Sequence, residues 1–169
     1  VIFREEAVMN ADGTIGYTGE FNGQAYVTSN GSVLFRDSVI TGAPAAEGKP
    51  AQGIVDFTVN NGNAGFSNMT LEGIADFDLT INNAVTNSVT GKPYEFTVNN
   101  LEVIENATLN IIANNMNSMI NDLVVRDNAD VTLDVDNGSI LFDQIIVNGD
   151  LTADDDQATL NVNADNGNV

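Results

Sequence analysis

The sequence predicts an all-β protein, a right-handed parallel β-helix (β-solenoid) with coils of about 22 residues. Three observations support this class. A short alternating segment occurs five times, a second type of segment alternates with it, and both are rich in β-branched residues and Asn. Such residues form helices poorly, and apolar–polar alternation is typical of strands.

The first repeated segment runs from a small residue through alternating apolar positions to an asparagine. Because side chains alternate between the faces of a strand, every second position should point inward. A one-residue slip would bury aspartates, so the register is well specified. The predicted inward ladders are Val55, Phe77, Leu109, Val131 and Leu160, then Phe57, Leu79, Ile111, Leu133 and Val162, then Val59, Ile81, Ala113, Val135 and Ala164.

The asparagines that end these segments predict a structural ladder at one corner of the coils. Asn tolerates the left-handed backbone conformation that a sharp corner needs, and stacked side-chain amides can hydrogen-bond from coil to coil. We therefore expect a structural role for them and no ligand. The members of this corner ladder are Asn61, Asn83, Asn115, Asn137 and Asn166.

The second segment begins with an apolar residue, has Asn, Asp or Gln two positions later, and usually ends with Gly or an acid. Successive segments start 31, 32, 22 and 22 residues apart, so the first two steps contain extra residues. The five starts are Phe35, Phe66, Val98, Ile120 and Phe142.

The extra residues predict loops at 43–52 and 84–93, with a third, shorter insertion at 152–157. Gly and Pro interrupt the first two, as loops require, and such insertions in solenoids often carry binding. Residues 1–34 fit the repeat poorly, so we expect an N-terminal cap or a degenerate coil there. Residues 35–169 should form a β-helix of about five coils, whose uncovered ends favour self-association or contact with neighbouring coils of a longer chain.

Composition excludes several kinds of partner. The chain has 5 Lys and Arg against 24 Asp and Glu, a formal charge of −19, so it would repel nucleic acid and anionic membrane surfaces. No run approaches the roughly 20 apolar residues of a membrane helix, so direct membrane insertion is not expected. Without Cys, the chain has neither disulfides nor thiolate chemistry.

Outward aspartates are the candidate catalytic groups. Asp76 and Asp78 share one strand face, as do Asp130, Asp134 and Asp136. Inverting glycoside hydrolysis needs two carboxyl groups roughly 6.5–9.5 Å apart, which positions i and i+2 can meet. The chain has no His, however, and its basic residues are scattered. We therefore predict no catalytic residue and no enzyme, with a polysaccharide-degrading or tailspike-like β-helix enzyme as the alternative.

A calcium site is the one metal site that the sequence suggests. The acidic loop residues Asp154, Asp155 and Asp156 could supply some of the six to eight oxygens that Ca²⁺ needs. No EF-hand loop and no nonapeptide calcium repeat is present. A solvated acidic face is therefore favoured over a bound cation, and no cofactor is expected.

The alternating segments, the Asn-Gly turns and the Phe-x-Asn/Asp strands resemble the passenger domains of Gram-negative autotransporters and the polymorphic outer-membrane adhesins. The resemblance covers about residues 30–169 and is one of repeat style, which phage tailspikes and surface-layer proteins share. It implies a secreted bacterial protein, extracellular or on the cell surface, that acts as an adhesin or a stalk. A host or cell-surface receptor or a glycan would then be the partner, and end-to-end assembly into a filament is a variant of this hypothesis.

Overall fold

The computed structural model describes residues 7–9, 15–17, 20–21, 23–48, 51–84, 90–149 and 157–169, and these contain strands and no helix. The all-β prediction is therefore confirmed. The strands are β1 (Ala7–Met9), β2 (Ile15–Tyr17), β3 (Glu20–Phe21), β4 (Gln24–Asn30), β5 (Val33–Gly42), β6 (Ile54–Asn60), β7 (Ala64–Gly73), β8 (Asp76–Asn82), β9 (Tyr94–Val103), β10 (Thr108–Asn114), β11 (Met116–Arg126), β12 (Asp130–Asp136), β13 (Ile140–Asn148) and β14 (Thr159–Asp165).

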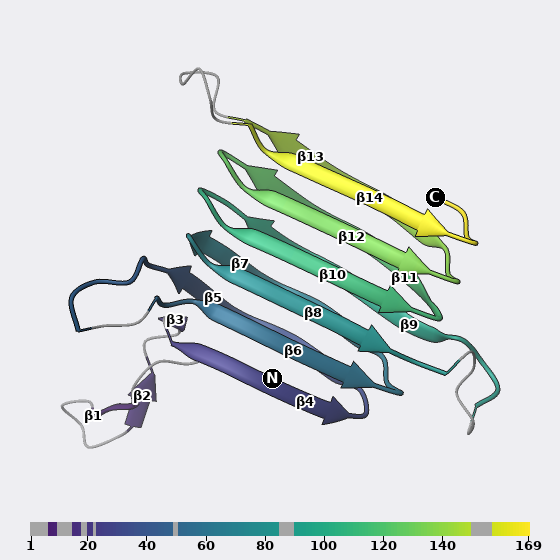
Figure 1. Ribbon diagram of the computed structural model, residues 1–169, viewed down its shortest axis with the longest axis horizontal. Coiled ribbons are helices and arrows are strands. Elements are labelled where there is room, and N and C mark those ends of the chain that lie inside the picture. The colour runs from purple at the N-terminus through teal and green to yellow at the C-terminus, as the bar shows by residue number, and fades with distance from the viewer. Residues whose placement is uncertain are drawn as a thin grey trace.

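Two parallel sheets contain all but two of these strands (Figure 1). The front sheet has the order β14-β12-β10-β8-β6-β4, and the rear sheet has the order β13-β11-β9-β7-β5-β3. From β3 onward the chain alternates between the two sheets, so each strand pairs with the strand two places further along. The remaining strands, β1 and β2, form an antiparallel pair at one end.

The register of the front sheet matches the three predicted apolar ladders. Leu79 pairs with Phe57 on one side and with Ile111 on the other, and Leu133 continues the same column. These side chains are at most 3% exposed. Leu160, Val162 and Ala164 of β14 are only partly buried, because β14 is the outermost strand of the sheet.

The rear sheet supplies the other half of the core. The predicted segment starts stack in one column, in which Phe35 pairs with Phe66, Phe66 with Val98, and Ile120 with both Val98 and Phe142. The Phe35 and Phe66 rings stack 5.2 Å apart, and each meets Phe77 of the front sheet edge-on. Aromatic packing therefore joins the two sheets near β5–β8, and aliphatic side chains join them further along the stack.

The rear strands bend at a position that sequence reasoning did not identify. Asp37, Asn68 and Asn100 have φ angles of 50°, 53° and 58° in the middle of β5, β7 and β9. These are the Asp and Asn two residues after each apolar segment start, so the signal was present in the repeat. Asn and Asp adopt this left-handed conformation more readily than other residues, which explains their place at the bend.

The predicted insertions fall between consecutive strands. The loop at 43–52 is closed at its base by backbone hydrogen bonds between Ala43 and Gln52 in both directions, at 3.3 and 2.9 Å. The predicted insertion at 84–93 falls between β8 and β9, and its residues 85–89 lie outside the described residues. Most of the predicted insertion at 152–157 lies outside the described residues.

Candidate functional surfaces

The corner ladder follows the front strands, and each of its five asparagines lies directly after β6, β8, β10, β12 or β14. Four of them have φ angles between 53° and 59°. The fifth, Asn83, does not adopt positive φ; it lies where the insertion at 84–93 begins, and it is 7% exposed. Its Oδ1 accepts a hydrogen bond from the Gly62 backbone N–H at 2.8 Å.

The carboxamides at this corner bond to backbone groups of adjacent repeats. The Ala84 N–H donates to Asn61 Oδ1 at 3.1 Å, and Asn115 Nδ2 donates to the Asn83 carbonyl at 2.7 Å. The amide-to-amide bonds lie one residue earlier, where Asn60 donates to Asn30 and Asn114 donates to Asn82, each at 3.2 Å. Hydrogen bonds at this corner therefore connect successive repeats.

Sequence reasoning missed two further polar ladders that join repeats. At the rear-strand bend, Asn68 donates to Asp37 and Asn100 donates to Asn68, both at 3.1 Å. At the next corner, Glu105 Oε2 accepts the Gly73 backbone N–H at 2.8 Å, and Asp127 Oδ2 accepts that of Glu105 at 3.4 Å. The Gly or acid at the end of each second segment was the signal for this corner.

The outward face of the front sheet contains the candidate catalytic carboxylates. Asp56, Asp78 and Asp134 border a shallow hollow of about 430 Å³ on this face. Asn110 Nδ2 donates to Asp78 Oδ1 at 2.8 Å, and Asn163 Nδ2 donates to Asp134 Oδ1 at 3.2 Å. Two of these carboxylates are thus bonded to amides of neighbouring strands.

Among the described carboxyl groups of this face, Asp76 has a pKa shifted from its ordinary value. Partial burial raises the pKa of the Asp76 carboxyl, and the negative charge of Asp78 raises it further. No strand of the front sheet carries Lys or Arg, so no cation of these strands offsets that repulsion. A raised carboxyl pKa occurs in general acids, but it also occurs wherever like charges are stacked.

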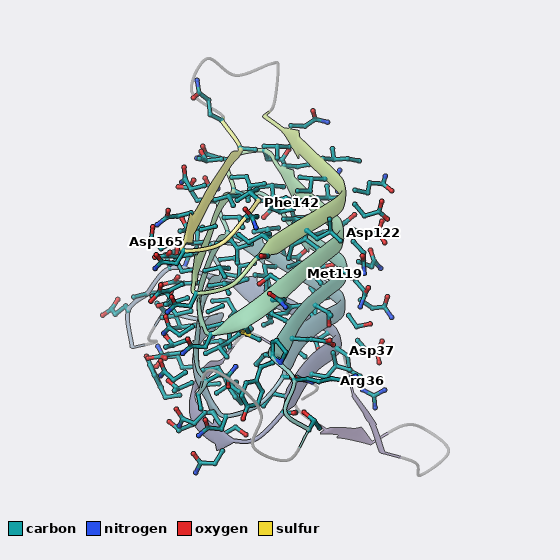
Figure 2. All side chains as sticks on the ribbon, turned by 90° about the vertical axis from the view of Figure 1, so that its right-hand side faces the viewer. Arg36, Asp37, Met119, Asp122, Phe142 and Asp165 are labelled. Carbon is teal, nitrogen blue, oxygen red and sulfur yellow. The ribbon has the colours of Figure 1, made fainter. Side chains whose placement is uncertain are left out.

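The described ion pairs lie on the rear sheet. Arg126 reaches Glu102 at 3.4 Å, and Arg36 reaches its neighbour Asp37 at 3.9 Å. Both pairs are well exposed, and such pairs contribute about 0–1 kcal/mol. Figure 2 shows Arg36, Asp37, Met119 and Asp122 on the rear-sheet side of the molecule, opposite Asp165 of the front sheet.

No cluster of three or more potential metal-binding side chains occurs within the described part of the chain. The calcium candidates Asp154, Asp155 and Asp156 lie outside the described residues, so the structure says nothing of them. Among the residues that are described, no helix is long and apolar enough to span a bilayer.

Comparisons with protein-family models, with curated proteins and with solved structures find no match to this chain. The class that the fold defines is an all-β protein with two stacked parallel sheets. The resemblance to autotransporter passengers and adhesins therefore stays a prediction.

Proposed function

We propose that the chain is a right-handed parallel β-solenoid that serves as a non-enzymatic structural or adhesive module, outside a bacterial cell or on its surface. The alternation of strands between two parallel sheets supports the solenoid, and parallel crossover connections are right-handed in about 98% of cases. The setting outside the cell rests on the resemblance in repeat style alone.

One observation carries the structural role: polar side chains on the front sheet bind one another from repeat to repeat. The bonds from Asn110 to Asp78 and from Asn163 to Asp134 occupy carboxylates that a catalytic mechanism would need free. A hydrolytic site also needs groups that converge on one substrate bond, whereas these columns spread their carboxylates over several strands. The face is therefore better suited to holding repeats together than to chemistry.

The loops at 43–52 and 84–93 are the proposed recognition elements, with a receptor or glycan as the partner. Both segments lie between the end of one strand and the start of the next, so their sequences can vary without changing the apolar ladders. The paired backbone of Ala43 and Gln52 gives a natural point at which to shorten the first loop.

Glycan-array binding tests the recognition role. Each loop would be replaced in turn by a short Gly-Ser turn, beginning after Ala43 in the first case. We expect binding to fall with one or both replacements while the midpoint of thermal unfolding is unchanged. Glycan binding that survives both replacements would contradict the assignment to the loops.

A polysaccharide-degrading enzyme is the second candidate, favoured by the raised pKa of Asp76 beside Asp78. Release of reducing ends from acidic and neutral polysaccharides measures this activity directly. We expect none from the unmodified chain. Turnover that Asp76→Asn and Asp78→Asn each abolish, with folding retained, would establish the enzyme instead.

The edges of the two sheets support contact with further strands. Val27 of β4 is 42% exposed and Val147 of β13 is 40% exposed, although their column neighbours Phe57 and Val125 are buried. We propose that these edges pair with neighbouring coils of a longer chain or with a second copy of the chain. Electron microscopy separates the versions, because monodisperse short rods would exclude a filament of this chain.

A further inference from the structure

A column of outward side chains crosses the first half of the rear strands. Backbone register places Leu34 beside Gly65, Gly65 beside Thr97, and Thr97 and Leu141 on either side of Met119. We call these five residues the Leu34–Leu141 column. Leu34 and Met119 are each 45% exposed and Leu141 is 61% exposed, so large apolar side chains lie in a row at the surface.

Gly65 makes a notch in this column. A Cβ atom at Gly65 would lie 2.6 Å from the Thr97 carbonyl oxygen, so no larger residue fits without displacing backbone. A hollow of about 250 Å³ opens there between Leu34 and Thr97. On the other side of Thr97, Met119 stands at the matching place as an exposed and flexible side chain.

The column is self-complementary about Thr97. A two-fold axis along β9 reverses the order of the strands but keeps each position along them. It brings Met119 of a second copy against the notch at Gly65, and Leu141 of that copy against Leu34. We propose that this face is a homodimer interface, in which two copies pack their Leu34–Leu141 columns face to face.

The neighbouring column gives charge complementarity under the same two-fold axis. Arg36 pairs in register with Ser67, Ser67 pairs with Asn99, and Asn121 donates a hydrogen bond to Asn99. Asp143 ends this column, since it follows Phe142, the register partner of Ile120. The axis therefore sets Arg36 opposite Asp143 of the second copy, twice per dimer. Two copies of a chain with a net charge of −19 repel each other overall, and these two contacts between opposite charges offset part of that repulsion.

One contact in the proposed interface is repulsive, so removing it should strengthen the dimer. Glu95 lies in the column on the other side of Thr97 and pairs in register with Asn117. The two-fold axis sets exposed Glu95 near its own copy, so two carboxylates approach each other. Like charges across an interface weaken association, and Glu95→Gln should therefore strengthen it.

The small size of the face is typical of weak, transient association. Five strands spaced about 4.8 Å apart and some five residues of each strand make about 400 Å² per copy. This is half of the roughly 800 Å² per partner in a standard interface, so we expect a weak and reversible dimer.

Sedimentation equilibrium from about 10 µM to about 1 mM protein tests the proposal, because weak dimers dissociate within that range. We expect the mass to rise from monomer toward dimer and to stop there. Met119→Ser and Leu141→Ser should each weaken the dimer by about tenfold or more. The matched control is Ile112→Ser, which removes a 47% exposed side chain from the front sheet and should change nothing.

A charge exchange tests the pairing itself. Arg36→Glu alone should suppress the dimer, because it would set a carboxylate opposite that of Asp143, and Arg36→Glu combined with Asp143→Arg should restore it. A monomer at every concentration would overturn the proposal. So would growth beyond two copies that Met119→Ser leaves unchanged, or a dimer that the double exchange fails to restore.

Discussion

Asn110 donates a 2.8 Å hydrogen bond from Nδ2 to Oδ1 of Asp78, its register partner on the neighbouring strand β8. Asp56 and Asp78 are already register partners in this outward column, and Asn110 sets an amide beside them where a third carboxylate would otherwise follow. Amides at such positions let an acidic chain stack parallel strands about 4.8 Å apart.

Asn110→Asp removes that amide and sets two carboxylates side by side. We expect a loss of about 1 kcal/mol in the free energy of unfolding at pH 7, because a bond is lost and like charges face each other. Urea denaturation at pH 7 and at pH 3 measures it. The loss should shrink at pH 3, because acid weakens the repulsion between neighbouring carboxylates, and equal stability of variant and parent at pH 7 would contradict the stacking role.

Asp76→Asn should stabilise the protein at neutral pH. The pKa of Asp76 is raised on folding, so the folded state binds its proton more tightly than the unfolded state does. This contribution is complete below the unfolded pKa and is lost as pH rises through the folded pKa. The unfolding midpoint of Asp76→Asn should therefore exceed that of the parent at pH 7 and approach it near pH 3. A lower midpoint at pH 7 would show that the charge is stabilising.

Substitution by glycine should affect stability differently at two residues of the corner ladder. Asn137 has a φ of 54°, so Asn137→Gly should be nearly neutral, while Asn137→Ala should cost about 1 kcal/mol. Asn83 has no positive φ and bonds to the Gly62 N–H, so Asn83→Gly should cost about 1–3 kcal/mol. Chemical denaturation of the three variants checks this, and a costly Asn137→Gly would refute the conformational account of that corner.

Core truncation should matter most where the aromatic rings of the two sheets meet. Phe66 is fully buried and contacts the rings of Phe35, Phe77 and Phe96, so Phe66→Ala should cost about 3–5 kcal/mol. Phe142 lies in the same column but is only partly buried in the outermost rear strand, so Phe142→Ala should cost clearly less. Thermal unfolding of the two variants compares the sites. Equal losses of stability would contradict the conclusion that the core is packed most tightly at Phe66.

Periodicity was enough to predict the strands from β5 to β14 and their register, whereas the short strands β1, β2 and β3 within residues 1–34 were not predicted. Alternation of apolar and polar residues fixes which face of each strand is buried, so Leu79 and Ile111 could be aligned without coordinates. The bend at Asn68 was not predicted. A polar residue within an alternating strand pattern is expected to face outward, and the pattern gives no information about its φ angle. The hydrogen-bond partners of Asn61 and Asn115 also required coordinates, since backbone and amide acceptors lie equally close at a corner.

The candidate surfaces were less predictable than the fold. Sequence spacing placed Asp76 and Asp78 on one face, but only the structure reveals the amides that bind such carboxylates. The Leu34–Leu141 column was hidden, because its five members come from segments 22 to 32 residues apart and include Gly and Thr. No simple hydrophobic pattern in the sequence identifies these residues. They are brought together by the register of the rear strands.

Nuclear Overhauser effects between methyl groups test the central claim, the in-register stacking of the repeats, most directly. In selectively methyl-labelled protein, the account predicts cross-peaks that link Leu79 to Ile111 and Ile111 to Leu133, as the paired strands require. Cross-peaks that instead join Leu79 to Leu109 and Ile111 to Val131, with those direct links missing, would reveal a two-residue shift in register and contradict the account.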